Sequence, residues 1–214
     1  KIMRAMQVKL TDGEQARVYG KGTDNLEAYL KWLQGKEYLL GARREEIFLA
    51  RQILEETVSL DPDWAQAYVL LGWTYLVELL FGWSNSPEQS LNEAFNLAQK
   101  SINLDDSIPG PHGLMSQIYV LKRQHDRAIG EAERAVELDP QFALAHARVA
   151  DAHLSIHQQG FDQSNRRIAL AKEAIDRALE LDPNHPEVLQ ALGDYFYRGL
   201  RDYDQALGQY ARAQ

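Results

Sequence analysis

The sequence of 214 residues contains no cysteine. A disulfide framework, a thiolate zinc site and a cysteine nucleophile are therefore excluded. The absence does not choose a compartment, because a reduced cytosol and an oxidising periplasm both tolerate chains without cysteine. The opening segment KIMRAMQVKL has no initiator methionine and no signal-peptide cleavage pattern. We therefore expect a piece of a longer protein, and a cytoplasmic location is favoured.

Basic residues are in the minority, since 23 Lys and Arg face 31 Asp and Glu, for a formal net charge of −8. This balance argues against a nucleic-acid partner, because phosphate backbones are bound by basic surfaces. Long apolar runs are also absent. The longest, YVLLGWTYLVELLFGW at residues 68–83, contains Glu78 and is shorter than the ~20 residues of a membrane span. We expect no membrane insertion of this segment.

A recurring triplet is present instead. Leu-Asp-Pro stands at residues 60–62, 138–140 and 181–183, and the variant Leu-Asp-Asp stands at 104–106. Since proline cannot continue a helix and keeps the preceding residue out of the helical region, each triplet predicts a helix end. Small residues recur twelve and five positions before each triplet's last residue, namely Ala50, Ala94, Ala128 and Ala171, then Thr57, Ser101, Ala135 and Ala178. Small side chains on one helix face allow a neighbouring helix to approach closely.

A second pattern follows three of the triplets. Its members are Tyr68, Leu71, Gly72 and Tyr75; His112, Met115, Ser116 and Tyr119; and Leu189, Leu192, Gly193 and Phe196. Offsets of three, four and seven residues define one stripe of a helix. Each unit is therefore predicted to be two amphipathic helices, and the triplet separates one unit from the next.

The helix starts also have local signals. Pro186 is suited to a first helical position behind a cap at Asn184 or His185, and Ser86 precedes Pro87 in the same way. Asp63 is predicted to cap the helix after the first triplet. Units two and four carry about ten and about nine extra residues between their two helical patterns. We expect these two hairpins to be lengthened, with a compact unit between them.

The spacing of these residues resembles the tetratricopeptide repeat (TPR). The clearest copy runs from Pro109 to Phe142 and carries His112, Met115, Ser116, Tyr119, Ala128, Ala132, Ala135 and Pro140. The resemblance implies an all-α fold, a right-handed superhelical α-solenoid of about five TPR-like helix-turn-helix units. The units are expected at residues 24–63, 64–108, 109–142, 143–185 and 186–214.

Residues 1–23 differ from the repeats. IMRAMQVKL is predicted to form a short linker helix, and TDGEQARVYGKGT a polar connector. The stretch QVKLTDGEQARVYGKGTDNLEAYL is similar to a junction in bacterial proteins that carry a class III adenylate/guanylate cyclase domain, a TolB-like α/β domain and then TPRs. This resemblance contains none of the cyclase catalytic residues. It therefore concerns a parent protein and implies no activity in this segment.

Enzymatic sites have weak support. His146, His153 and His157 lie close in sequence near Asp151, and such spacing can hold a metal ion. However, His112, His146 and His153 occupy positions where the repeat expects buried aromatic residues. No serine lies in a strand-turn-helix context. We predict no catalytic residue, cofactor or metal, and keep a metal-binding or hydrolytic site on the fourth unit as an alternative.

The inner wall of the solenoid is the predicted binding surface, because stacked hairpins expose their first helices there. The partner-groove candidates are Trp32, Lys36, Gln66, Val69, Trp73, Val77, Gln117, Val120, Arg148, Asp151, Asp194 and Tyr197. Trp73 follows Gly72, one residue off the packing stripe, so it is predicted either to face the groove or to pack on the next unit. Tryptophan is enriched at binding hot spots.

The predicted function is a non-catalytic protein–protein interaction or scaffold module. The resemblance makes it the regulatory carboxy-terminal part of a bacterial nucleotide cyclase-like signalling protein. The expected partner is a protein or peptide segment in the groove, with Arg148 and Asp151 setting its charge preference, or a second copy of the chain. Phe81 and Trp83, at a hairpin tip, are a possible apolar contact or dimer surface. An oligomerisation or spacer module for upstream domains is the other alternative.

Overall fold

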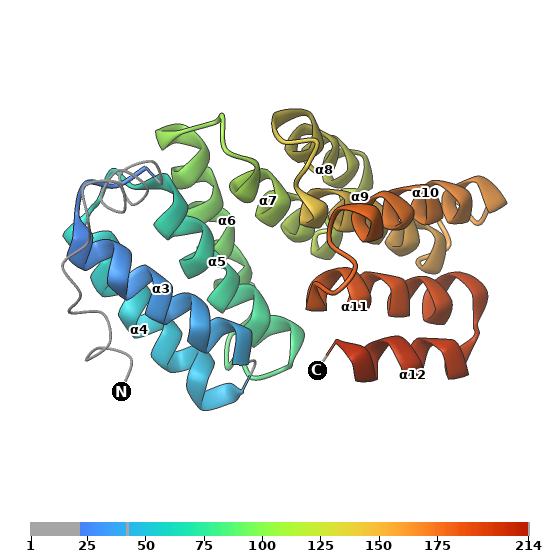
Figure 1. Cartoon of the computed structure of the whole chain (residues 1–214), viewed down its shortest axis with the longest axis horizontal. Coiled ribbons are helices and arrows are strands. Elements are labelled where there is room, and N and C mark those ends of the chain that lie inside the picture. Colours follow the sequence, from blue (N-terminus) through green and yellow to red (C-terminus); the bar gives the residue numbers. More distant parts are fainter. Residues whose placement is uncertain (1–21, 42, 214) are drawn as a thin grey trace.

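The computed structural model describes residues 22–41 and 43–213 and consists of five helical hairpins (Figure 1). These described residues contain no strand, so the prediction of an all-α solenoid of five units is confirmed. The predicted linker helix lies outside them. The hairpins are α3 (Leu26–Gly41) with α4 (Arg44–Leu60), α5 (Ala65–Leu80) with α6 (Pro87–Leu104), α7 (Pro109–Leu121) with α8 (His125–Leu138), α9 (Ala143–Gln158) with α10 (Asn165–Leu181), and α11 (Pro186–Asp194), continued by the π-helical turn η1 (Tyr195–Leu200), with α12 (Tyr203–Arg212).

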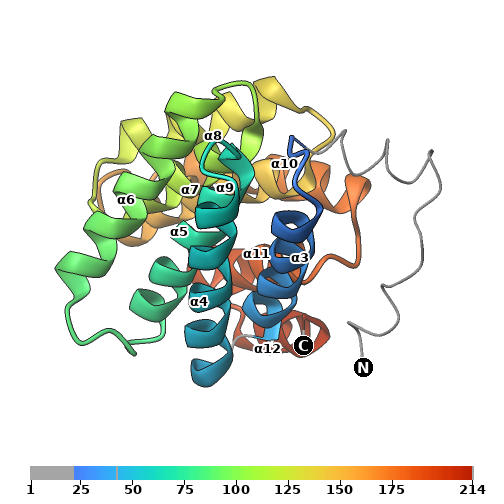
Figure 2. The ribbon, with the colours of Figure 1, turned by 90° about the vertical axis from the view of Figure 1, so that its left-hand side faces the viewer.

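The hairpins stack in chain order along a curved path (Figures 1 and 2). Each second helix packs on the first helix of the next hairpin. The first helices also pack on one another, from α3 through α5, α7 and α9 to α11, and among the described residues the second helices do not do so to the same extent. The first helices therefore form the inner layer of the curve, which is the side predicted to carry the groove.

The four triplets end four helices in the same way. Asp61, Asp105, Asp139 and Asp182 each follow the last helical residue in a non-helical conformation. Each donates its backbone N–H to the carbonyl of one of the predicted small residues, at 2.9 to 3.1 Å. The prediction that the triplet separates units is thereby confirmed, including for the copy without proline.

The helix starts follow the sequence signals only in part. Pro186 begins α11, and the His185 side chain caps it by accepting the Glu187 N–H at 3.2 Å. Pro87 begins α6 as predicted, although the Ser86 side chain makes no cap hydrogen bond. The prediction that Asp63 caps α5 was wrong. The chain extends one residue further, so that the buried Trp64 occupies the cap position.

Close helix contact depends on the eight small residues predicted from the repeat. All eight, from Ala50 to Ala178, have no exposed surface. Two hydroxyl groups also join the helices of a hairpin, since Ser101 Oγ donates to the Ala65 carbonyl at 2.7 Å and Ser116 Oγ to the Ala128 carbonyl at 2.8 Å. The larger core side chains, including Leu54, Leu114 and Leu154, fill the space beside these contacts.

The lengthened hairpins are confirmed. Helices α5 and α6 have 16 and 18 residues and α9 and α10 have 16 and 17, whereas α7 and α8 have 13 and 14. The first hairpin is also long, with 16 and 17 residues, which its weak repeat pattern did not indicate. No helix among the described residues has the length and apolar character needed to cross a membrane.

Two substitutions on α8 test whether the stability of the fold depends on a small side chain where two helices meet. Replacing the fully buried Ala128 by Leu is expected to lower the free energy of unfolding by about 1–3 kcal/mol, because the neighbouring helix cannot move away. Gly130→Ala is the matched control, since a Cβ there meets nothing within 4 Å, and it is expected to raise that free energy by about 1 kcal/mol. Urea unfolding measures both. Equal stability of the A128L variant and the wild type would contradict the packing argument.

His112 gives stability a pH dependence that can be measured. Its buried ring donates from Nδ1 to Glu131 at 2.7 Å, and this hydrogen bond raises the pKa of His112 against the opposing effect of burial. The folded-state pKa lies above the unfolded value, so the stabilisation is complete below about pH 6.5 and is lost as pH rises through the raised pKa. Unfolding in urea from pH 5.5 to 8.5 should show the decline, and Glu131→Gln should abolish it.

Candidate functional site

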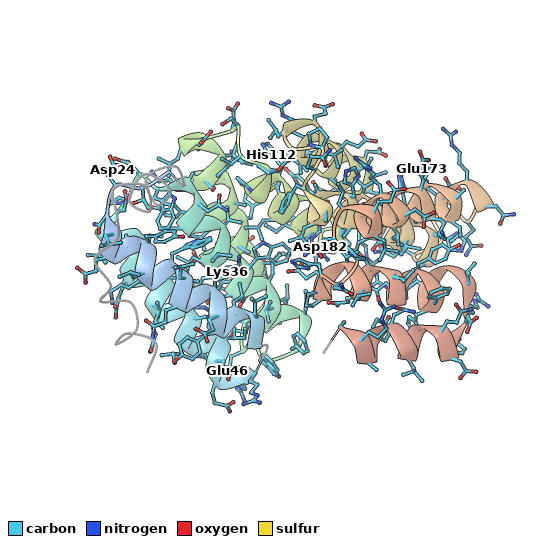
Figure 3. The ribbon with its side chains drawn as sticks, in the orientation of Figure 1. Asp24, Lys36, Glu46, His112, Glu173 and Asp182 are labelled. Atoms are coloured by element: carbon cyan, nitrogen blue, oxygen red, sulfur yellow. The ribbon has the colours of Figure 1, made fainter. Side chains whose placement is uncertain are left out.

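The twelve predicted groove residues differ in exposure. All lie on the first helices or on η1, within the inner layer. Lys36 and Tyr197 are exposed, and Figure 3 shows Lys36 on α3. Gln66, Trp73, Val77, Arg148 and Asp194 are partly buried, whereas Trp32, Val69, Gln117, Val120 and Asp151 are buried.

The buried candidates pack mainly within the protein. The Trp32 ring lies 5.6 Å from that of Trp64, centroid to centroid, in the core of the first hairpin. Val120 packs against the buried Ala128 and Ala152. In this conformation the accessible part of the predicted groove therefore consists of the partly buried and exposed side chains.

One arginine links the inner faces of several units. Arg148, on α9, places its guanidinium 4.6 Å from the centre of the Trp73 ring on α5. The same guanidinium donates from Nη2 to the Glu187 carboxylate on α11. Between α5 and α9 lies α7, where a Cβ at Gly113 would stand 3.9 Å from Arg148 Cγ. A tryptophan and an arginine are thus presented together at the middle of the inner layer.

A second polar network closes the inner layer at its carboxy-terminal end. Arg198, in η1, donates from Nη1 to Asp151 on α9 at 2.7 Å, and its Nη2 lies 3.4 Å from Asp194 on α11. Asp194 also accepts the Tyr210 hydroxyl of α12 at 2.7 Å. Burial raises the pKa of Asp194, while Arg198 and the Tyr210 hydrogen bond oppose that rise. Burial and the hydrogen bond to Asp194 raise the pKa of Tyr210.

Glu187, Arg198 and Tyr210 were not predicted as part of the site. Arg198 stands one residue after the predicted Tyr197, so counting one position further along the repeat would have found it. Arg198 lies in the π-helical turn η1, and π-helical turns are frequent at functional sites. The arrangement as a whole presents hydrogen-bonding groups, charges and aromatic rings on the inner layer.

The alternative of a metal site on the fourth hairpin is not supported by the ligand geometry. No three His, Asp or Glu side chains of the described residues lie together in a way that could hold a metal ion. His146 Nε2 contacts the Pro140 carbonyl at 3.1 Å, and His153 Nδ1 accepts from Arg167 at 3.2 Å. Burial, together with the Arg167 charge, lowers the pKa of His153 to about 4. The ring therefore stays neutral and fills an aromatic position, as its place in the repeat predicted.

Two solved structures resemble this chain in fold. The thermophilic TPR protein TTC0263 of Thermus thermophilus matches 87% of this chain and 89% of its own, with a TM-score of 0.63 and 21% identity. Pseudomonas aeruginosa PilF matches 88% of this chain and 77% of its own, with a TM-score of 0.56 and 18% identity. At these identities the similarity concerns the fold alone. No protein-family model matches the chain.

One curated protein is similar in sequence. It is named "Putative adenylate cyclase 3", comes from Rhizobium meliloti strain 1021, and is 32% identical over 127 residues. The match covers 59% of this chain and 22% of that protein. The chain therefore corresponds to a minor part of the relative's length.

Removing the Arg198 side chain tests whether the second network holds the last hairpin. Arg198→Met leaves the buried Asp151 and the partly buried Asp194 without their cation, and we expect the free energy of unfolding to fall by about 2 kcal/mol. Fully buried pairs lose about 3–5 kcal/mol, and partial exposure reduces that effect. Arg166→Met, at an exposed position on α10, is the matched control and should change stability by less than about 0.5 kcal/mol. Equal effects of both substitutions in urea unfolding would refute the role of the network.

Proposed function

Because the chain has the TPR fold, we propose that it is a non-catalytic protein-interaction module that holds an extended segment of a partner protein along its inner layer. Curved stacks of helical hairpins create long concave surfaces suited to this task. The observation that carries the proposal is the pairing of Trp73 with Arg148 at the centre of that layer. Tryptophan and arginine are among the side chains most enriched at binding hot spots.

The chemistry of the layer supports a polypeptide ligand. Trp73 packs against a core cluster shared by α5, α6 and α7 and leaves part of its ring accessible as an apolar surface. Gln66, on the same helix, and the exposed Tyr197, at the carboxy-terminal end of the stack, offer hydrogen-bonding groups. Arg148 and Asp151 are each already paired, with Glu187 and Arg198. A partner therefore gains little from one charge alone, and must combine apolar anchoring with hydrogen bonds that replace or extend these pairs.

The proposed setting is the regulatory carboxy-terminal part of a larger bacterial signalling protein of the nucleotide cyclase type, located in the cytoplasm. The sequence similarity to the Rhizobium meliloti protein favours this setting, together with the resemblance of the first thirty or so residues to a cyclase–TolB–TPR junction. The enzymatic step would belong to another part of that protein. Sequencing the gene upstream of the codon for Lys1 tests this proposed setting. The absence of a cyclase domain there would refute this part of the proposal.

Oligomerisation is the second candidate function, and one observation favours it. Phe81 and Trp83 stack at the tip of the second hairpin with ring centres 4.7 Å apart, and Phe81 is 56% exposed beside Leu80 at 52%. Light scattering over a range of concentrations distinguishes the two functions. A dimer that Phe81→Ser converts to a monomer would favour the oligomerisation module.

Trp73→Ala is the decisive substitution for the groove. We expect the variant to lose the proteins that the wild type captures from a lysate of the source organism, with affinity reduced by at least about 2 kcal/mol, or roughly thirtyfold, for a hot-spot tryptophan. Quantitative mass spectrometry of the captured proteins, then calorimetry with the one most enriched, measures the loss.

Trp83→Ala is the matched control, because it removes the same side chain from a hairpin tip outside the inner layer. It should leave capture unchanged if the groove is used. If Trp83→Ala lost binding and Trp73→Ala kept it, the partner would bind at the hairpin tip and the groove proposal would be refuted. Circular dichroism and urea unfolding verify that both variants are folded.

A further inference from the structure

The tips of the third and fourth hairpins enclose a cleft outside the inner layer. It has a volume of about 700 Å³ and is formed by the turn between α7 and α8 on one side and the turn between α9 and α10 on the other. Arg123, His125 and Arg127 line the first side, and Phe161 and Arg167 line the second. Three arginines and two aspartates, Asp126 and Asp162, therefore line the cleft.

Unsatisfied polar atoms gather at these two tips. Among the described residues, five buried side-chain nitrogen or oxygen atoms have no hydrogen-bond partner, and three of them are ring nitrogens of His125 and His157. Both nitrogens of His125 are in this state, and its ring packs against Phe161 with centres 4.5 Å apart. A buried polar group without a partner costs free energy, and of these two histidines it is His125 that lines the cleft.

The charges around the cleft favour an anion. The Arg123 side chain makes no hydrogen bond or salt bridge to any described residue, so its guanidinium is free to bind. Arg167 already bonds Asp162 at 2.8 Å, and the remaining carboxylate of the cleft is Asp126. Burial lowers the pKa of His125; the Asp126 charge opposes this effect, and the charges of Arg123 and Arg167 add to it. Both arginines therefore act electrostatically on the same ring.

Arg123 also has an unusual backbone conformation, and one other arginine, Arg201, shares it. Gly82 and Gly160 end the first helices of units two and four with positive φ of 69° and 79°, a conformation that glycine adopts without strain. Arg123 and Arg201 occupy the corresponding positions in units three and five, with φ of 56° and 57°. The two arginines thus share one strained backbone conformation, and only Arg123 lies in the cleft.

We propose that this cleft binds a phosphate-type oxyanion, held by the Arg123 guanidinium together with Arg127 and Arg167 beside the His125 ring. Arginine suits this ligand, because its planar fork can give two parallel hydrogen bonds to phosphate oxygens. The exposed ring of Phe161 offers an apolar face to whatever carries the phosphate group. A free phosphate and a phosphate group on a protein share this chemistry.

To test this proposal, the 214-residue chain is titrated with inorganic phosphate. Sodium chloride keeps the ionic strength constant, and backbone amide NMR shifts report binding. We expect saturable shifts at residues 122–127 and 159–167. Arg123→Gly should weaken binding about tenfold or more, as expected for loss of a charge-assisted contact. Arg201→Gly should leave binding within about twofold of the wild type, since it makes the same backbone change outside the cleft.

A short peptide with one phosphoserine, compared with its serine form, identifies the source. Tighter binding of the phosphoserine peptide than of inorganic phosphate assigns the cleft to phosphoproteins, and comparable binding of the two assigns it to free phosphate. The proposal is overturned if neither ligand saturates, or if the R201G variant loses as much affinity as the R123G variant. Both glycine variants relieve strain, so failure to fold is not expected, and thermal unfolding verifies this.

Discussion

The close approach of neighbouring helices is the constraint on which this structure depends. A single hairpin is too thin to enclose its own apolar side chains, so each must cover them with the next hairpin. Eight small residues, repeated at two positions of the second helices, have no exposed surface and permit that contact. The same contact brings the first helices side by side. The inner layer, and with it the candidate binding surface, is therefore a consequence of where Ala, Ser and Thr recur in the sequence.

The features that could be predicted are those set by local chemistry or by strict periodicity. The triplet ends a helix whether its third residue is Pro140 or Asp106, because the extended Asp and its hydrogen bond recur in both cases. Asp63 failed as a cap because burial of the Trp64 ring, a tertiary effect, decides where α5 begins. The exposure of Trp32 and Val120 was beyond prediction for the same reason, since it depends on which neighbour covers each one.

The polar side chains of the inner layer contribute to the structure differently from the apolar ones. Arg148 and Arg198 are partly buried and paired with carboxylates from other hairpins. Such pairs give little net stability, because desolvation offsets the Coulomb attraction, but a lone charge in their place is costly. They therefore fix the position of one hairpin relative to another more than they stabilise either. A partner bound at Trp73, as proposed, would meet side chains already held in place, which would lower the entropy lost on binding.

The last hairpin depends on polar contacts as well as on apolar packing. Its second helix, α12, contributes only Ala206 to the buried residues of the described structure, and Leu207 and Tyr203 are 66% and 57% exposed. Apolar burial therefore holds α12 weakly. Tyr210 adds a hydrogen bond to Asp194, and Arg198 joins Asp194 in turn to Asp151 on α9. Because these polar contacts are partly buried, salt screens them much less than it screens exposed pairs. The attachment of α12 therefore depends more on the hydrogen bond at Asp194 than on ionic strength. A ligand spanning from Trp73 to Tyr197, as proposed, would therefore reach an end of the inner layer that Arg198 joins to α9 through a few polar contacts.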